Sequence, residues 1–341
     1  MDTDQRLSEL KTWLANLGSE WGIKPETILP ASSDASFRRY FRVLGQKGAP
    51  ETSYIVMDAP PQHEDTRPFT RISGLLNQAG LNVPRVLRAD PKAGFLLLSD
   101  LGNTTYLSAL NRDTAQKLYD DASNALITMQ LASHPGTLPD YDDALLRREM
   151  GLFSEWFLGK HHQLILSPQE QADLERVIEV ILKNNLAQPK VTVHRDYHSR
   201  NLMVTAENNP GILDFQDAVY GPITYDLASI YRDAYIEWEE PKQMDWVIRY
   251  WEKARKVGLP VQNDFGDFYR DFEWMGLQRH LKVLGIFARL FHRDGKAGYL
   301  KDIPLVFKYT RKVAERYNTF KPLIKLLDKV EGISRTDGFT F

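Results

Sequence analysis

The sequence predicts an α+β protein of two lobes, with a small antiparallel sheet in the N-terminal lobe and a larger, mostly helical C-terminal lobe. Three observations predict this. Short runs of aromatic and β-branched residues occur in the first hundred residues, apolar residues recur at helical spacing through most of the remainder, and 341 residues are enough for two lobes. We therefore expect an N-terminal lobe of residues 1–100 and a C-terminal lobe of residues 101–341.

The expected N-terminal lobe consists of a helix, a strand pair, a second helix and two more strands. Leucines at helical spacing predict a first helix that ends at Gly18. The runs 36–43 and 53–59 flank a segment with Gly and Pro, so they predict a β-hairpin. The remaining elements are a helix over about 66–79 that ends at Gly80, then strands within 83–89 and 94–100.

The expected C-terminal lobe follows a linker near 100–104. The helices expected in its first part span 114–132, 142–158 and 168–186. The last of these opens with Ser167 and Glu170, a capping-box start with proline at the first helical position. Short strands within 191–215 then interrupt the helices, which resume from about 223.

The composition excludes several classes of protein. Net charge is −2 with both signs intermingled, so we expect neither a nucleic-acid partner nor a polybasic membrane patch. The chain has no cysteine, which excludes disulfides, thiolate zinc sites and cysteine nucleophiles. No apolar run is long enough to span a membrane, and the N-terminus lacks the pattern of a signal peptide. We expect a cytoplasmic protein with no membrane association and no obligate protein partner.

The segment 191–204, "VTVHRDYHSRNLMV", places a polar loop between two expected short strands. It fits the catalytic-loop pattern of kinases, H-R-D followed five residues after the aspartate by Asn201. That pattern requires a second metal-binding aspartate on a nearby strand. Asp214 in "GILDF" meets the requirement, because it follows across the turn expected at "ENNPG".

These residues predict phosphoryl transfer. Asp196 would orient the acceptor hydroxyl and accept its proton, while Asn201 and Asp214 would hold Mg²⁺ on the phosphates. His194 is expected to support the loop rather than to contact substrate. The alternative for all four residues is an ordinary polar hairpin.

The motifs "VHRDYHSRNLM" and "ILDFQDAVYGPITYDLASI" resemble those of the aminoglycoside phosphotransferase/choline kinase superfamily of small-molecule kinases. More narrowly, "SSDASFRRYFRV", "YIVMDAPP", "GFLLLSDLG" and "RREMGLFSEWFL" resemble the bacterial cell-wall sugar kinases, which phosphorylate the anomeric hydroxyl of N-acetylmuramate and N-acetylglucosamine. The resemblance implies a protein-kinase-like bilobal fold, ATP and Mg²⁺. It also implies that Asp226 in "YDLAS" braces the catalytic loop; alternatively, Asp226 is only the N-cap of its helix.

The expected nucleotide site departs from the kinase pattern. "PASSDASFRRY" stands in place of a glycine-rich loop, so Ser33 and Ser36, with their neighbour Ser32, would approach the phosphates through hydroxyls and amides. Met57 stands about where the phosphate-pairing lysine is expected. Arg38 is the nearest candidate to balance the phosphate charge, and a surface arginine on a strand is the alternative reading.

The segment "LLLSDLG" places an apolar strand directly before the expected linker. In kinases the adenine is bound there by backbone groups, which Asp100 and Leu101 would supply. The alternative is a plain strand end.

The expected acceptor site must serve an anionic and a neutral sugar. Glu149, Arg147 and Trp156 lie on one expected helix and could accept hydroxyls, bind a carboxylate and cover a sugar face. His198 and Arg200, in the catalytic loop, either contact substrate or stabilise the loop. The alternative for the helix residues is an apolar stripe with solvent-exposed arginines.

The leading hypothesis is therefore an ATP-dependent kinase of a small-molecule amino sugar. Two alternatives stay open. One is another kinase of the superfamily, with an aminoglycoside, choline or amino-alcohol acceptor. The other is a nucleotide-binding pseudokinase, suggested by Met57 and the missing glycines.

Overall fold

The chain forms two compact units. The structure, a computed structural model, describes residues 4–17, 20–33, 37–46 and 52–333. The sheet unit consists of Met1–Ala109 and Asn201–Asp217, and the helical unit of Leu110–Arg200 and Ala218–Phe341. The stretch Asn201–Asp217 thus belongs to the sheet unit, although sequence of the helical unit lies on both sides of it.

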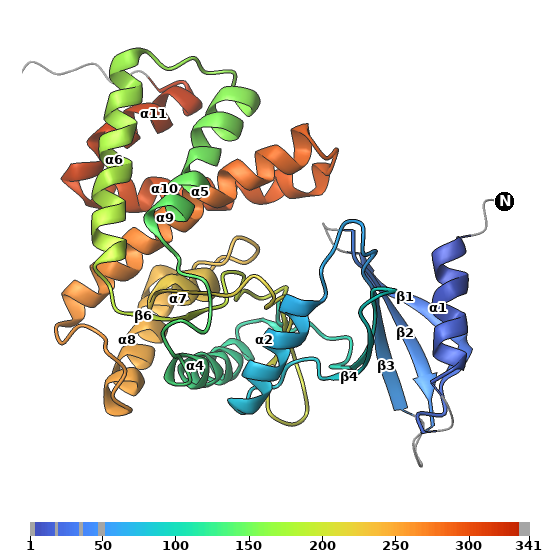
Figure 1. The fold of residues 1–341 in the computed structure, drawn as a ribbon. Helices are drawn as coiled ribbons and strands as arrows, with labels where there is room; N and C mark the ends of the chain where they lie inside the picture. Colours follow the sequence, from blue (N-terminus) through green and yellow to red (C-terminus); the bar gives the residue numbers. More distant parts are fainter. Residues whose placement is uncertain (1–3, 18–19, 34–36, 47–51, 334–341) are drawn as a thin grey trace, which may run out of the picture. The chain divides into compact units, whose positions relative to one another are not determined.

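The sheet unit contains a five-stranded antiparallel sheet with strand order β1-β2-β3-β5-β4 (Figure 1). The expected hairpin is confirmed, since β2 and β3 pair from Arg39 opposite Asp58 to Gly45 opposite Thr52. The sequence does not predict β1, because this segment contains two prolines, which argue against a strand. In the structure β1 is an edge strand, where a proline without an N–H group is tolerated. The strands are β1 (Lys24–Ser33), β2 (Arg39–Gly45), β3 (Thr52–Asp58), β4 (Val86–Asp90) and β5 (Phe95–Ser99).

The first helix, α1 (Gln5–Ala15), packs on this sheet. The expected end of this helix, Gly18, lies outside the described residues. One core cluster contains Leu10, Leu14, Trp21, Phe41, Val43, Tyr54, Val56, Phe95 and Leu97. On β2, β3 and β5 the members of this cluster occur at every second residue, so one face of the sheet is buried. Each such side chain contributes about 1.5–3 kcal/mol on burial.

The second expected helix is confirmed as α2 (Arg67–Gln78). Its buried residues Phe69, Ile72 and Leu76 recur at helical spacing. Gly80 follows with a φ of +84°, in the left-handed region where glycine commonly ends a helix.

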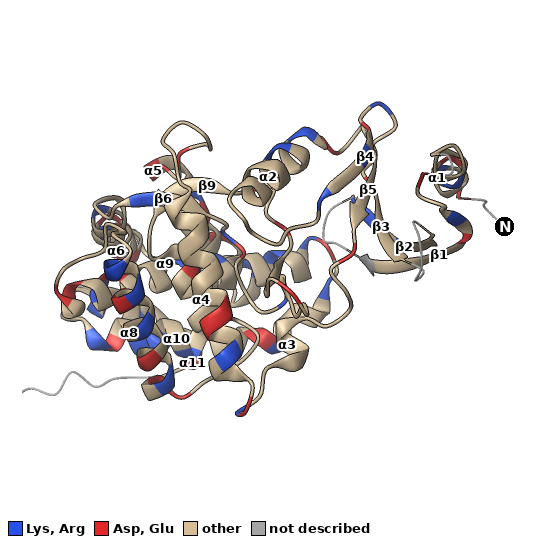
Figure 2. Cartoon of the chain, turned by 90° about the horizontal axis from the view of Figure 1, so that it is seen from below, with Lys and Arg blue, Asp and Glu red and all other residues tan. Residues whose placement is uncertain are grey.

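The helical unit is built around α9, a helix of 28 residues that packs against α5, α6, α7 and α10. Acidic and basic residues both occur in α8, and its last turn carries only basic ones (Figure 2). None of the helices in the described ranges combines the length and apolar character that a bilayer crossing requires. The helices of the unit are α4 (Ala115–Leu131), α5 (Asp143–Leu152), η1 (Phe153–His161), α6 (Pro168–Leu186), α7 (Tyr225–Tyr231), α8 (Glu240–Lys256), α9 (Phe265–His292), η2 (Ala297–Asp302), α10 (Ile303–Arg316), η3 (Asn318–Phe320) and α11 (Lys321–Glu331).

Two of the helices expected here are confirmed as α4 and α6. At the start of α6 the capping box is present, because Ser167 Oγ accepts from the Glu170 amide and the Glu170 carboxylate accepts from the Ser167 amide. The helix expected over 142–158 is corrected. It ends as an α-helix at Leu152 and continues as a π-helix to His161. Apolar spacing does not separate these two forms, because both bury one face.

Four short strands flank the polar loop, but they form two separate pairs. β6 (Lys190–Val193) pairs with β9 (Val219–Pro222) in the helical unit, and β7 (Leu202–Met203) pairs with β8 (Gly211–Ile212) in the sheet unit. The strand expected over 212–215 therefore ends at its first residue. Thr105 adds a bridge to Met203, next to the short helix α3 (Tyr106–Ala109) of the sheet unit.

The close approach of α9 to the end of α5 predicts a cost for a side chain at Gly285. A Cβ at that position would lie 2.5 Å from Leu152 Cβ and would also clash with the Leu152 backbone. We expect Gly285→Ala to lower the free energy of unfolding by about 1–3 kcal/mol, measured by denaturant titration. Gly151→Ala is the matched control, because nothing lies within 4 Å of its added Cβ. Equal effects of the two changes would contradict this packing account.

Candidate active site

The polar loop of residues 194–200 is fixed at its start by one carboxylate. Asp226 Oδ2 accepts the amide of His194 at 2.7 Å, and Oδ1 accepts the amide of Arg195 at 3.0 Å. Asp226 is 1% exposed and follows the first residue of α7, whose N-cap is Thr224. Asp226 is therefore not the helix N-cap, and both of its oxygens serve the loop.

The Arg195 backbone has a conformation that is rare for a residue with a side chain. Its φ is +77°, in the left-handed region, which costs of order 1 kcal/mol or more outside glycine. The bond from its amide to Asp226 holds this conformation. The guanidinium forms an ion pair with Glu149 and lies over the Tyr141 ring, 5.6 Å from its centroid. Both the backbone and the side chain of Arg195 are thus held from the helical unit.

Glu149 is the centre of a buried charge network rather than an exposed substrate contact. It is 5% exposed, accepts a hydrogen bond from the Tyr141 hydroxyl, and lies 3.1 Å from Lys282 Nζ. Burial alone would raise the pKa of Glu149, but Lys282 and Arg195 together hold that pKa below its usual value. Its oxygens are engaged by Tyr141, Arg195 and Lys282, and the expectation that Glu149 accepts hydroxyls of a substrate stays a prediction.

Asp196 is the loop carboxylate expected to accept a proton. Burial would raise its pKa, but Lys282, His198 and Arg279, with a smaller effect of His194, hold the pKa below its usual value. At neutral pH the carboxylate is therefore ionised, which is the form that can accept a proton from a hydroxyl.

The end of the loop is fixed by a second buried carboxylate, Asp233. Its Oδ2 accepts the amide of Ser199 at 2.9 Å, and its Oδ1 accepts the amide of Tyr235 at 3.1 Å. His198, 8% exposed, places its ring edge-on to the Tyr235 ring at 5.3 Å. The loop therefore has a carboxylate anchor at each end.

Asn201, Asp214 and Gln216 form the hairpin cluster of the sheet unit. Asn201 Nδ2 lies 3.3 Å from Asp214 Oδ2, and Gln216 Nε2 donates to Asp214 Oδ1 at 2.6 Å. Asp214 has a φ of +64°. The buried Oε1 of Gln216 accepts no hydrogen bond from a described residue.

The hairpin cluster fits a small, hard divalent cation. An asparagine amide can be turned without a change of shape, which would bring its oxygen toward Asp214. Two ligands of one Mg²⁺ at 2.0–2.1 Å lie roughly 3 Å apart, close to the separation seen here. In the described residues no group of three or more His, Asp or Glu side chains is arranged for a metal. A site of one carboxylate and one or two amides agrees with that, because Mg²⁺ takes its other ligands from water and phosphates.

The residues expected to contact phosphates are only partly described. Ser36 lies outside the described residues, and of Ser33 the structure describes only the backbone, at the end of β1. Arg38 is paired with Glu64, with 3.0 Å from Nε to Oε2. Burial would lower the pKa of Arg38, but Tyr40 and Glu64 raise it, so the guanidinium stays charged.

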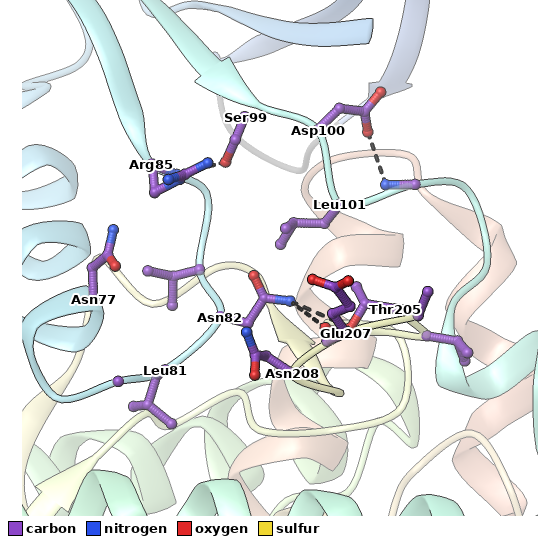
Figure 3. A pocket seen from close by; sticks show the side chains of 15 residues that line it. Asn77, Leu81, Asn82, Arg85, Ser99, Asp100, Leu101, Thr205, Glu207 and Asn208 are labelled. Atoms are coloured by element: carbon purple, nitrogen blue, oxygen red, sulfur yellow. Dashed lines mark hydrogen bonds between the residues drawn. The ribbon is translucent and has the colours of Figure 1, made fainter. Parts of the chain in front are cut away.

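A pocket of about 750 Å³ lies within the sheet unit (Figure 3). It is lined by the end of α2, residues 80–83, Arg85, the end of β5, the following Asp100 to Gly102, and the turn between β7 and β8. Asp100 and Leu101 both line it, but the Asp100 carboxylate accepts from the Gly102 amide at 2.9 Å and from Arg42 Nε at 2.5 Å. Both oxygens of this carboxylate are thus engaged within the protein, and binding of a ligand by the main chain of Asp100 stays a prediction.

Arg147 and Trp156, the other residues expected on the same helix as Glu149, take no part in the contacts described above that anchor the loop. Arg147 of α5 forms ion pairs with Asp143 and with Glu179 of α6. Trp156 is half-buried in η1. The structure thus brings Glu149 to the loop, but gives Arg147 a surface network on another side of the same helix.

The sequence pattern described as the phosphotransferase enzyme family matches residues 27–261, which is more than half of the chain. The chain belongs to this phosphotransferase family. It is 47% identical over 334 residues to a Pseudomonas aeruginosa protein named N-acetylmuramate/N-acetylglucosamine kinase, covering 96% of this chain and 97% of the relative. It is also 47% identical over 342 residues to a Neisseria meningitidis protein of the same name, covering 99% and 100%.

Solved structures show the same fold as this phosphotransferase. An ethanolamine kinase of Plasmodium vivax gives a TM-score of 0.61 at 11% identity, covering 91% of this chain and 95% of that one. An ADP-bound aminoglycoside phosphotransferase gives 0.54 at 15% identity, covering 92% and 99%. The expected protein-kinase-like α+β fold is confirmed.

Sequence reasoning missed three residues of this phosphotransferase site. Asp233 lies seven residues after Asp226 and two residues beyond the end of α7, so the sequence offered no helix-face signal for it. Lys282 is a charged residue within the mainly apolar α9, which already signals a buried partner. Gln216 had no signal beyond its place two residues after Asp214.

The buried Asp226 carboxylate, which accepts the two loop amides, predicts a pH dependence of the free energy of unfolding. Burial, the largest effect, raises the pKa of Asp226 to about 7 despite its two amide donors. Asp226 then binds a proton more tightly in the folded state than in the unfolded chain. Its contribution to the free energy of unfolding is fully present below about pH 4 and is lost as pH rises through about 7. Relative to Asp226→Asn, wild-type unfolding free energy should fall by about 2 kcal/mol between pH 5 and 7.

Denaturant titrations at pH 5, 6, 7 and 8 measure this difference. Ser229→Ala, a buried and non-titrating change on the same helix, is the control and should run parallel to wild type. A constant difference between wild type and Asp226→Asn across these pH values would contradict the prediction.

Proposed function

We propose that this chain is an ATP-dependent kinase that phosphorylates the anomeric hydroxyl of N-acetylmuramate and N-acetylglucosamine in peptidoglycan recycling. The observation that carries the proposal is the 47% identity, over nearly the full length of both chains, to proteins named for these two sugars. The ionised carboxylate of Asp196 supports it from the chemistry of the loop.

In this proposal Asp196 is the general base. It would orient the sugar hydroxyl and accept its proton as the phosphoryl group is transferred. An anomeric hydroxyl is more acidic than an ordinary alcohol, so a carboxylate is a sufficient base. Asp226, Asp233 and His194 would position the loop without contacting the sugar.

Asn201 and Asp214 would hold magnesium, and Gln216 would orient Asp214. When bound, the ion would neutralise charge on the phosphates and align them. Backbone groups of Asp100 and Leu101 would bind the adenine of ATP, and Ser33, Ser36 and Arg38 would lie toward its phosphates. The ADP-bound structure with the same fold supports the nucleotide part of the proposal. Use of ATP also favours a cytoplasmic location.

The same fold also occurs in an ethanolamine kinase and an aminoglycoside phosphotransferase, so cationic acceptors are the competing proposal. The two proposals predict turnover with different acceptors, amino sugars in one case and cationic compounds in the other. With ADP release as the readout, we expect turnover with both amino sugars and none above background with choline, ethanolamine or kanamycin. Phosphorus NMR of the product should show phosphate on the anomeric carbon. Turnover with the cations alone would refute the sugar proposal.

Met57 in place of a lysine favours a second alternative, a pseudokinase that binds nucleotide without turnover. Asp196→Asn distinguishes this from an enzyme. Removing the base should lower kcat about 10²–10⁴-fold and leave ATP affinity within a few-fold of wild type, measured by coupled assay and by calorimetry.

The neutral amide of Asp196→Asn keeps the shape of the side chain, so circular dichroism should be unchanged. A wild-type protein that binds ATP but phosphorylates no acceptor would support the pseudokinase. Unchanged kcat in the variant would remove Asp196 from the mechanism.

A further inference from the structure

Arg200 ends the polar loop, four residues after Asp196, and lies on aromatic rings. Its Cζ is 3.6 Å from the centroid of the Tyr235 ring and 5.8 Å from that of the Tyr299 ring. Tyr235 follows α7, and Tyr299 belongs to η2. Aromatic faces of this kind bind cations, including cationic ligands. Here a cation of the protein itself already occupies them.

The donors of Arg200 are largely unused. Its Nη2 lies 3.5 Å from Asp302 Oδ2, which is an ion pair but longer than a charged hydrogen bond. Among the described residues no hydrogen bond accepts from its guanidinium, and its side chain is 35% exposed. The planar fork is therefore held in place by stacking while its N–H groups stay available for a ligand.

Buried polar atoms without hydrogen bonds lie in the same cluster. His198 Nδ1 and Arg279 Nη1 make no hydrogen bond with a described residue, and Asp302 Oδ2 has only its long ion pair with Arg200. His198 is 8% exposed and Arg279 is 3% exposed. His198 feels the charges of Asp196, Arg279 and Arg200, so these groups are neighbours. Buried polar atoms are normally paired, and a polar ligand with several hydroxyls would pair them.

We infer that Arg200 is the specificity residue for the acceptor, recognising a negatively charged substituent and disfavouring cationic acceptors. The inference rests on the proposed sugar-kinase function and names the feature of the sugar that this residue recognises. N-acetylmuramate carries a lactyl carboxylate that N-acetylglucosamine lacks. A guanidinium fork binds a carboxylate through two parallel hydrogen bonds, whereas a neutral hydroxyl gains much less from it.

The electrostatics of the cluster agree with this selectivity. Arg200 and Arg279 both act on His198 as like charges, so the cluster has a cationic side. An ammonium group placed there would meet Arg200 on the aromatic face where a cation would otherwise bind. Asp302 balances Arg200 in part. Burial, the largest effect, raises the pKa of Asp302, and Arg200 and Lys301 lower it.

The test is the ratio of kcat/KM for N-acetylmuramate to that for N-acetylglucosamine. In Arg200→Gln we expect kcat/KM for N-acetylmuramate to fall about 10- to 100-fold and that for N-acetylglucosamine to change less than about 3-fold. Arg200→Lys keeps the charge but loses the planar fork, so its ratio should lie between those of wild type and Arg200→Gln. Lys301→Gln removes an exposed charge next to Asp302 and is the control, with an unchanged ratio.

Each outcome decides one of the two proposals. If wild type phosphorylates neither sugar, the proposed function fails. If wild type phosphorylates both sugars and Arg200→Gln lowers them equally, the arginine only supports the loop and the inference fails. If Arg200→Gln does not fold, as judged by circular dichroism, Arg200→Lys carries the test, and an unchanged ratio in it refutes the inference.

Discussion

The hydrogen bonds from two loop amides to the buried Asp226 carboxylate are the interaction on which the rest of the helical unit's site depends. They hold Arg195 in a left-handed conformation that its side chain disfavours, and the chain then turns so that Asp196 follows. At the other end of the loop, the buried Asp233 carboxylate accepts the Ser199 amide in the same way. Side-chain carboxylates thus replace the ladder hydrogen bonds that this irregular backbone cannot make.

The surroundings of the neighbouring carboxylates Asp226 and Asp196 shift their pKa values in opposite directions. The pKa of Asp226 is raised by burial, whereas that of Asp196 is held low mainly because Lys282 and His198 outweigh burial. Lys282 is itself kept charged by Tyr225 and Glu149 although burial opposes this. In the proposed mechanism, this separation of pKa values lets Asp226 serve the structure while Asp196 stays ionised to accept a proton.

Local signals predicted much of the fold and of the motif residues. The β2–β3 hairpin, α2 and the capping box of α6 each depend on residues close in sequence, so pattern reading found them. Edge strand β1 was missed because its prolines matter only in a central strand. The place of Glu149 was missed for another reason. Spacing on α5 shows which residues share a face, but not that Arg195 and Lys282, from elements far along the chain, cover that face.

Met57 has a consequence for chemical proteomics. It is fully buried in β3, opposite Tyr40 in β2 and Leu96 in β5, at about the place where protein kinases carry a reactive amine. A thioether buried among apolar neighbours offers no such nucleophile. A reagent that acylates an amine at this place in the sheet would therefore leave residue 57 unmodified.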